Sequence, residues 1–238
     1  MANITLFDIE STRLEADFGF VICASYKELG SKKIVTHSID DYPNFKKDPT
    51  NDKFLLRDLK AGLEKADVLV GHYSTRFDLP FINGRLLHHG LTPVAPIPHV
   101  DTWRVSRNRL KITRNSLAAL AEFFGFDEKT YLNKNIWVRA SAGHRPSIKY
   151  IIEHCEQDVR VLEDVYTKIR VLAPDHPNIN LTRFVTKSDP RCPICGSHKL
   201  QKRGYIIART RRSPRYSCQE CGSWSRGAPE KVDGIVLK

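Results

Sequence analysis

The stretch NITLFDIEST, residues 3–12, is an apolar run that ends in two carboxylates. Its apolar and β-branched residues predict a β-strand. Residues two apart in a strand project from the same face, so Asp8 and Glu10 point the same way. Two adjacent carboxylates repel each other unless a cation lies between them, and hard oxygen ligands suit Mg²⁺ or Mn²⁺. The pair therefore predicts half of a metal site, with a solvent-exposed strand end as the alternative.

Size and charge point to the class of partner. The chain has 238 residues and a formal net charge of +11, which suits one main domain plus a small module. The basic charge favours a polyanion, and nucleic acid is the usual one. The sequence shows neither a basic amphipathic helix nor a run of about 20 apolar residues, and these are the features that would indicate a membrane partner. We therefore expect no membrane association and, because no secretion signal is recognisable, an intracellular, cytoplasmic location.

Hydrophobic periodicity outlines the rest of the main domain. Further strands are expected over residues 19–26, 33–38 and 67–71. Helices are expected over residues 54–66, 78–89, 115–125 and 147–171. A meander followed by a helix and a buried strand predicts an α/β fold with a mixed sheet and flanking helices.

Several polar or aromatic residues lie at informative places in this outline. Asp78 follows a predicted strand at the start of a helix, where it serves either as a cap or as a site residue. Asp101 is expected to cap the start of a helix, with a role in a functional site as the second interpretation. His154 and Asp158 are four residues apart, so they share one face of the long helix beside its apolar stripe. Trp137 lies in an aperiodic basic segment, residues 129–145, and is expected either to stack on a base or to anchor a loop.

Three short motifs together resemble those of the DEDD 3′-to-5′ exonucleases, a family with the ribonuclease H-like fold. They occur in the expected order as FDIE at residues 7–10, FDLPF at 77–81 and HCEQDV at 154–159. The resemblance spans about residues 4–170 and implies a two-metal phosphodiester hydrolase. It also implies four metal-binding carboxylates: Asp8, Glu10, Asp78 and Asp158. Two cations about 4 Å apart would neutralise the attacking and leaving oxygens, so the acids fit this chemistry.

The sequence departs from the family pattern at two positions. Family members carry a tyrosine four residues before the last aspartate, or a histidine five before it; here these places hold His154 and Glu153. A neutral imidazole suits proton abstraction near pH 7, so His154 is the expected general base and His144 the fallback. Tyr73 stands where many relatives have asparagine, and we expect it to stack on a base.

Six cysteines divide into two groups. Cys192, Cys195, Cys218 and Cys221 form C-x2-C-x22-C-x2-C, which predicts one structural Zn²⁺ in a module similar to zinc ribbons. Cys23 and Cys155 lie in apolar segments and are expected to be buried, inert thiols.

Between the two cysteine pairs lies a basic, aromatic hairpin expected to bind nucleic acid or to dock a protein. The candidate contacts are Lys202, Arg203, Tyr205, Arg209, Arg211, Arg212, Arg215 and Tyr216. The expected organisation is an exonuclease domain over residues 1–172, a linker over 173–190 and a zinc ribbon over 191–238.

The expected activity is 3′-to-5′ hydrolysis of nucleic acid, with single-stranded DNA as the preferred substrate. An exoribonuclease and a non-catalytic nucleic-acid-binding adaptor are the alternatives. The zinc ribbon also offers a docking surface for replication or repair proteins.

Overall fold

The computed structural model describes residues 2–126, 134–182, 189–208 and 211–230. The chain forms two compact units, Asn3–Ile169 and Arg170–Lys238. No helix in the described part of the chain is both long enough and apolar enough to cross a bilayer.

A five-stranded mixed sheet forms the centre of the first unit, in the order β3-β2-β1-β4-β5. The strands are β1 (Ile4–Ser11), β2 (Val21–Glu28), β3 (Val35–Ser38), β4 (Val68–Gly71) and β5 (His99–Asp101). β1 pairs antiparallel with β2 and parallel with β4, and β4 pairs parallel with β5. The stretch that opens the sequence is therefore the central strand, and the predicted mixed α/β fold is confirmed.

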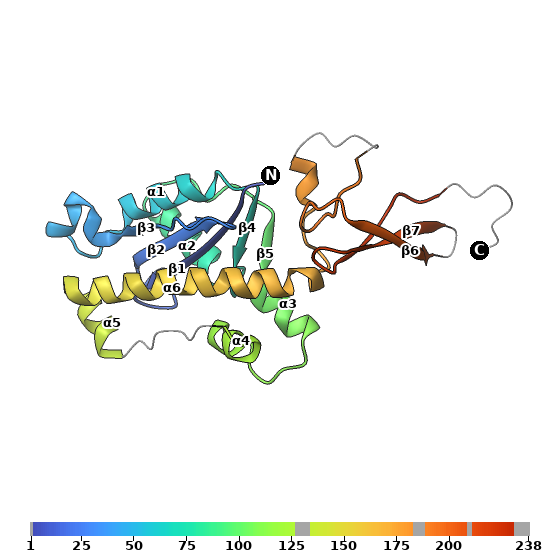
Figure 1. Ribbon diagram of the computed structural model, residues 1–238. Helices are drawn as coiled ribbons and strands as arrows, with labels where there is room; N and C mark the ends of the chain where they lie inside the picture. The colour runs from blue at the N-terminus through green and yellow to red at the C-terminus, as the bar shows by residue number, and fades with distance from the viewer. Residues whose placement is uncertain (1, 127–133, 183–188, 209–210, 231–238) are drawn as a thin grey trace. The chain divides into compact units, whose positions relative to one another are not determined.

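Helices cover both faces of this sheet (Figure 1). The helices of this unit are α1 (Lys53–Leu63), α2 (Asp78–His88), α3 (Thr102–Arg109), α4 (Leu117–Phe124), α5 (Lys134–Ser141) and α6 (Arg145–Ile169). Of these, α1 and α6 contact the strands, and α3, α4 and α5 contact α6. Lys27 of β2 ion-pairs with Glu163 of α6, whereas the neighbouring Tyr26 lies against Gly62 of α1. Because successive strand residues point to opposite faces, α6 and α1 lie on opposite sides of the sheet.

The apolar stripe of α6 explains why this long helix is bound so firmly to the sheet. Ile148, Ile151 and Cys155 are fully buried in the core that also contains Phe7 of β1. The predicted burial of Cys23 and Cys155 is confirmed, and burial raises the pKa of both thiols. Packing in the core thus fixes the position of α6 relative to β1, and these two elements carry three of the four predicted acids.

Three elements differ from the sequence-based outline: β5, α3 and α5. β5 was not expected, because three residues are too few to show a period. α3 was not expected either, and α5 lies within the segment expected to be aperiodic, residues 129–145. Its Ala140 is buried and its Ile136 and Trp137 pack against the core, so tertiary packing stabilises this short helix.

The second unit contains a three-stranded antiparallel sheet in the order β6-β7-β8. Its strands are β6 (Leu200–Ile207), β7 (Arg212–Cys218) and β8 (Trp224–Arg226). A small buried cluster of Cys192, Ile194 and Cys218 is its core. Such a small core contributes little on its own, so a metal cross-link is the expected source of stability.

Candidate active site

The site is built on the carboxyl-terminal half of β1. Asp8 and Glu10 are alternate residues of this strand, so both side chains project from its α6-facing side. The Cys155 thiol of α6 lies 3.5 Å from the Asp8 carbonyl oxygen and 3.7 Å from its Oδ2. β1 is flanked by strands on both sides, which fixes the backbone from which the two carboxylates extend.

Asp78 reaches the same place from α2. Asp78 is 3% exposed, and its Oδ1 accepts a hydrogen bond from the backbone N–H of Ile9 at 3.3 Å. Burial raises the pKa of Asp78 to about 7; the nearby Asp101 and Asp158 add to this rise, while backbone N–H groups oppose it. Burial therefore shifts Asp78 toward the protonated form, whereas a bound cation would favour the carboxylate.

α6 supplies the remaining two groups. His154 Nε2 lies 3.7 Å from Glu10 Oε1 and 3.7 Å from Asp158 Oδ2. His154 is 8% exposed and Asp158 is 4% exposed, so this histidine is not a solvated surface residue. The ligand atoms of Glu10, His154 and Asp158 all lie within 4.8 Å of one another, close enough to share an ion.

A pocket of about 590 Å³ joins these groups. It is lined by Asp8, Ile9, Glu10, His72, Tyr73, Phe77, Asp78, Trp103, Ser116, Leu117, His154 and Asp158. Four carboxylates and one imidazole form an oxygen-rich donor set that fits hard divalent cations such as Mg²⁺ or Mn²⁺. The structure thus brings all five residues predicted for the catalytic site into one pocket.

The pocket also has an aromatic wall that the sequence analysis recognised only in part. Tyr73 was predicted as a nucleic-acid contact, whereas Trp103 was not. Trp103 follows β5, and Tyr73 follows its parallel neighbour β4. Recognition of β5 would have predicted this proximity, because the carboxyl ends of adjacent parallel strands meet at one edge of a sheet.

Two other predicted residues lie elsewhere. Trp137 packs against the core from α5 and is not among the residues that line the pocket, which agrees with the anchoring alternative. His144 precedes α6, and its Nδ1 lies 2.9 Å from Ser147 Oγ. This contact places His144 at the start of the helix, away from the pocket lining.

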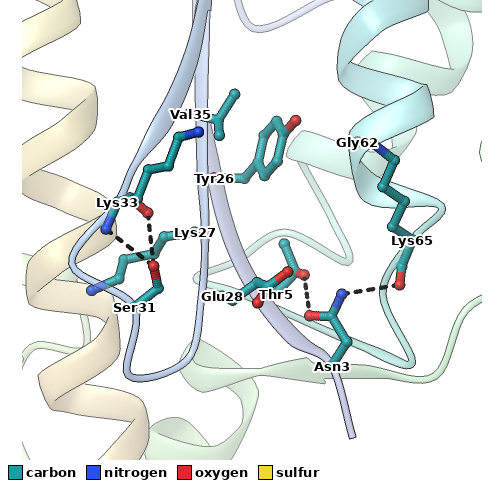
Figure 2. Close-up of a pocket in the computed structure, with 10 residues that line it drawn as sticks. All are labelled: Asn3, Thr5, Tyr26, Lys27, Glu28, Ser31, Lys33, Val35, Gly62 and Lys65. Atoms are coloured by element: carbon teal, nitrogen blue, oxygen red, sulfur yellow. Dashed lines mark hydrogen bonds between the residues drawn. The ribbon is translucent and has the colours of Figure 1, made fainter.

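A second pocket in the same unit, of about 290 Å³, lies near the amino end of β1. Figure 2 shows its polar groups, with Lys33 and Lys65 on opposite sides of the Tyr26 ring. Lys27 extends toward α6, where it ion-pairs with Glu163. None of the groups of possible metal ligands in the described residues lies there, so we place the candidate active site in the larger pocket.

The four cysteines of the second unit converge as predicted. Cys192 and Cys221 have Sγ atoms 3.7 Å apart, and so have Cys195 and Cys218. A tetrahedron with metal–sulfur bonds of about 2.3 Å has edges of about 3.8 Å, whereas a disulfide would be about 2.05 Å. The thiol spacing therefore fits one tetrahedral ion. Burial tends to raise the pKa of Cys192, but hydrogen bonds from Ser223 and backbone N–H groups lower it to about 7.

The basic hairpin presents cations on aromatic rings. Lys202 Nζ and Arg212 Cζ lie 4.6 and 4.5 Å from the centre of the Tyr205 ring, and Arg215 Cζ lies 4.7 Å from that of Trp224. These contacts favour phosphate binding by the positive groups over base stacking by Tyr205.

The other candidate contacts of this hairpin are less uniform. Arg203 and Arg211 are exposed, Tyr216 is partly buried in the central strand, and Arg209 lies outside the described residues.

Comparisons with known proteins place the first unit in a family. The chain is 29% identical over 146 residues to a protein described as DNA polymerase III PolC-type from Ureaplasma parvum, which covers 53% of this chain and 10% of that protein. It shares the fold of a family B DNA polymerase from Pyrobaculum calidifontis, with a TM-score of 0.56, 17% identity and coverage of 72% of this chain and 25% of that one. The chain thus spans a tenth to a quarter of the length of these two proteins. The family model described as RNase_H superfamily matches residues 5–170, and the chain therefore belongs to the RNase H superfamily.

Proposed function

We propose that the protein is a two-metal-ion 3′-to-5′ exonuclease. The observation that carries this proposal is the convergence of Asp8, Glu10, Asp78 and Asp158 from three separate elements into one pocket. Membership of the RNase H superfamily supports a nuclease activity in general. The order of the three motifs supports the 3′-to-5′ direction, and the similarity to DNA polymerases favours DNA.

The residues of the pocket have separate roles in this proposal. The four carboxylates would hold two Mg²⁺ or Mn²⁺ ions, which would supply neutralisation of charge on the attacking and leaving oxygens. His154 Nε2 accepts a proton from the attacking water, whose oxygen bonds to the phosphorus of the terminal phosphodiester. The bond from phosphorus to the 3′-oxygen breaks, that oxygen takes a proton from solvent water, and a nucleoside 5′-monophosphate leaves.

Glu10 and Asp158 also position His154. Each has a carboxylate oxygen 3.7 Å from Nε2, so both favour the imidazolium that forms when the proton is accepted.

The second unit is proposed as a zinc ribbon that increases affinity for nucleic acid. Cys192, Cys195, Cys218 and Cys221 hold one structural Zn²⁺, which leaves no open position for chemistry. The cations on the hairpin then bind phosphates, and this attraction falls as salt increases. Docking of replication or repair proteins is the alternative use of the same surface.

The test is degradation of single strands of DNA and RNA, labelled at either end, with Mg²⁺, Mn²⁺ or EDTA. We expect stepwise shortening from the 3′ end that requires metal and is abolished in Asp8→Asn. The exposed Asp17 is not among the residues that line the pocket, so Asp17→Asn is the matched control and should retain activity. Faster shortening of RNA than of DNA would mean that RNA is the preferred substrate. Strands that are bound but never shortened would refute the enzyme and support the adaptor.

A further inference from the structure

One buried carboxylate ties together the two segments that follow β4 and β5. Asp101 is 4% exposed. Its Oδ1 accepts hydrogen bonds from the backbone N–H groups of Tyr73 at 2.9 Å and Trp103 at 3.0 Å. Its Oδ2 accepts from the backbone N–H of Thr75 at 3.1 Å and from the Thr75 hydroxyl. Asp101 therefore fixes the backbone from which both aromatic side chains of the pocket wall extend.

The backbone of Tyr73 is held in a conformation that tyrosine disfavours. Its φ of 62° is the only positive value of a non-glycine residue in the described part of the chain. Glycine and asparagine adopt this left-handed region with less strain than a bulky residue does. Backbone geometry thus disfavours a tyrosine at position 73, so the reason for this residue lies in its side-chain ring.

The ring of Tyr73 is packed only in part. It meets the Trp103 ring edge to face, with 4.9 Å between centroids and an angle of 77° between planes. Tyr73 nevertheless remains 39% exposed, and both residues line the pocket that contains the four carboxylates. An aromatic surface beside a phosphodiester-cleaving centre suits a flat, apolar group attached to the reacting phosphate, which in nucleic acid is a base.

We infer that Tyr73 and Trp103 bind the base of the terminal nucleotide by stacking, and that Asp101 is the positioning residue for both. This inference rests on the proposed nuclease function and gives it a substrate preference. Every base offers a π face, so the preference is for an unpaired end that carries any base. Loss of that base should weaken binding about 5- to 150-fold.

The experiment uses three single-stranded DNA probes that differ only at or near the 3′ end. One carries 2-aminopurine as its terminal base, the second carries it at an internal position, and the third ends in an abasic nucleotide. The full-length protein binds them in EDTA, where no cleavage occurs, and affinity and 2-aminopurine fluorescence are recorded. Terminal 2-aminopurine should be quenched more than internal 2-aminopurine, and the abasic probe should bind about 5- to 150-fold more weakly.

Variants assign the effect to residues. Tyr73→Asn removes the ring and relieves the backbone, and Trp103→Leu removes the second ring; both should reduce the base preference and the terminal quenching. Tyr73→Phe keeps the ring and should keep both. Phe123→Ala is the control, because Phe123 is a 61% exposed ring on α4 outside the pocket lining. Asp101→Asn should weaken binding of the base-bearing probe more than that of the abasic probe, whereas a merely structural role would weaken both equally.

Parallel incubations with Mg²⁺ separate this inference from the proposed function. If the wild type prefers the base-bearing end but shortens no strand, the nuclease function is refuted and base stacking by Tyr73 and Trp103 is supported. If the wild type shortens strands but binds base-bearing and abasic ends equally, base stacking by Tyr73 and Trp103 is refuted and the nuclease function is not. Full base preference in both Tyr73→Asn and Trp103→Leu would also overturn base stacking by these residues.

Discussion

Replacement of Asp78 by asparagine should stabilise the metal-free protein while it abolishes cleavage. Burial raises the pKa of this carboxyl group from 3.8 to about 7. An acid whose pKa is higher in the folded state reduces stability above its unfolded pKa, because the unfolded chain ionises more readily. The loss of stability begins near pH 3.8, which is the pKa of the group in the unfolded chain, and is complete above about pH 7. Asparagine carries no charge, so the variant escapes this loss.

The pKa shift sets the size of the effect. Each pKa unit corresponds to about 1.4 kcal/mol, so a rise from 3.8 to about 7 gives an upper limit of about 4 kcal/mol. The asparagine Oδ1 can still accept the hydrogen bond that Ile9 N–H donates at 3.3 Å. A gain of half the limit, about 2 kcal/mol, would raise Tm by about 4–8 °C in a domain of this size.

Thermal unfolding in EDTA at pH 5 and pH 8 measures this effect. The advantage of Asp78→Asn over wild type should be larger at pH 8, where the wild-type carboxyl group is ionised. Mg²⁺ should then raise the Tm of wild type more than that of the variant, because it binds the complete set of carboxylates. Asp17→Asn is the control and should melt like wild type under all conditions. A variant that melts below wild type at pH 8 in EDTA would refute the reasoning.

Three further predictions concern other parts of the molecule. His154→Gln should lower kcat about 10²–10⁴-fold with little change in KM, because a general base is lost; steady-state cleavage of a labelled strand measures this, and an unchanged kcat would exclude the role. Cys195→Ser should lose zinc and bind strands more weakly, which metal analysis and titration at low salt report; a full zinc content would contradict it. Asp52 is 0% exposed and binds Arg85 and His89 at 2.8 and 2.6 Å, so Asp52→Ala should reduce the free energy of urea unfolding by about 3–5 kcal/mol. A loss below about 1 kcal/mol would contradict that last prediction.

Local periodicity accounts for the acids that the sequence analysis placed well. The two-residue period of a strand puts Asp8 and Glu10 on one face, and the four-residue spacing in a helix puts His154 beside Asp158. These rules act within one element, so they need no knowledge of the tertiary fold. The meeting of β1 with α6 was inferred from motif order rather than from periodicity.

The aromatic wall could not be predicted in the same way, because it depends on pairing between distant segments. Gly71 pairs with Asp101 only through the parallel register of β4 and β5, and β5 is too short to show a pattern. Tyr73, which has a left-handed backbone, likewise donates its backbone N–H to Asp101, 28 residues away. Contacts of this kind have no local signal in the residues themselves.

Asp78 and Asp101 show how two similar acids acquire different roles. Asp101 is the last residue of the short strand β5, Asp78 begins the helix that comes after the short strand β4, and both are almost fully buried. The Asp101 side chain caps α3 and also accepts hydrogen bonds from Tyr73 and Thr75, so its oxygens are occupied by structure. Asp78 is already the first residue of α2; its Oδ1 accepts a hydrogen bond from Ile9 N–H of β1, and it lines the pocket. The positions of both acids in the sequence allow a capping role; the hydrogen bonds assign that role to Asp101 and leave Asp78 available to a cation.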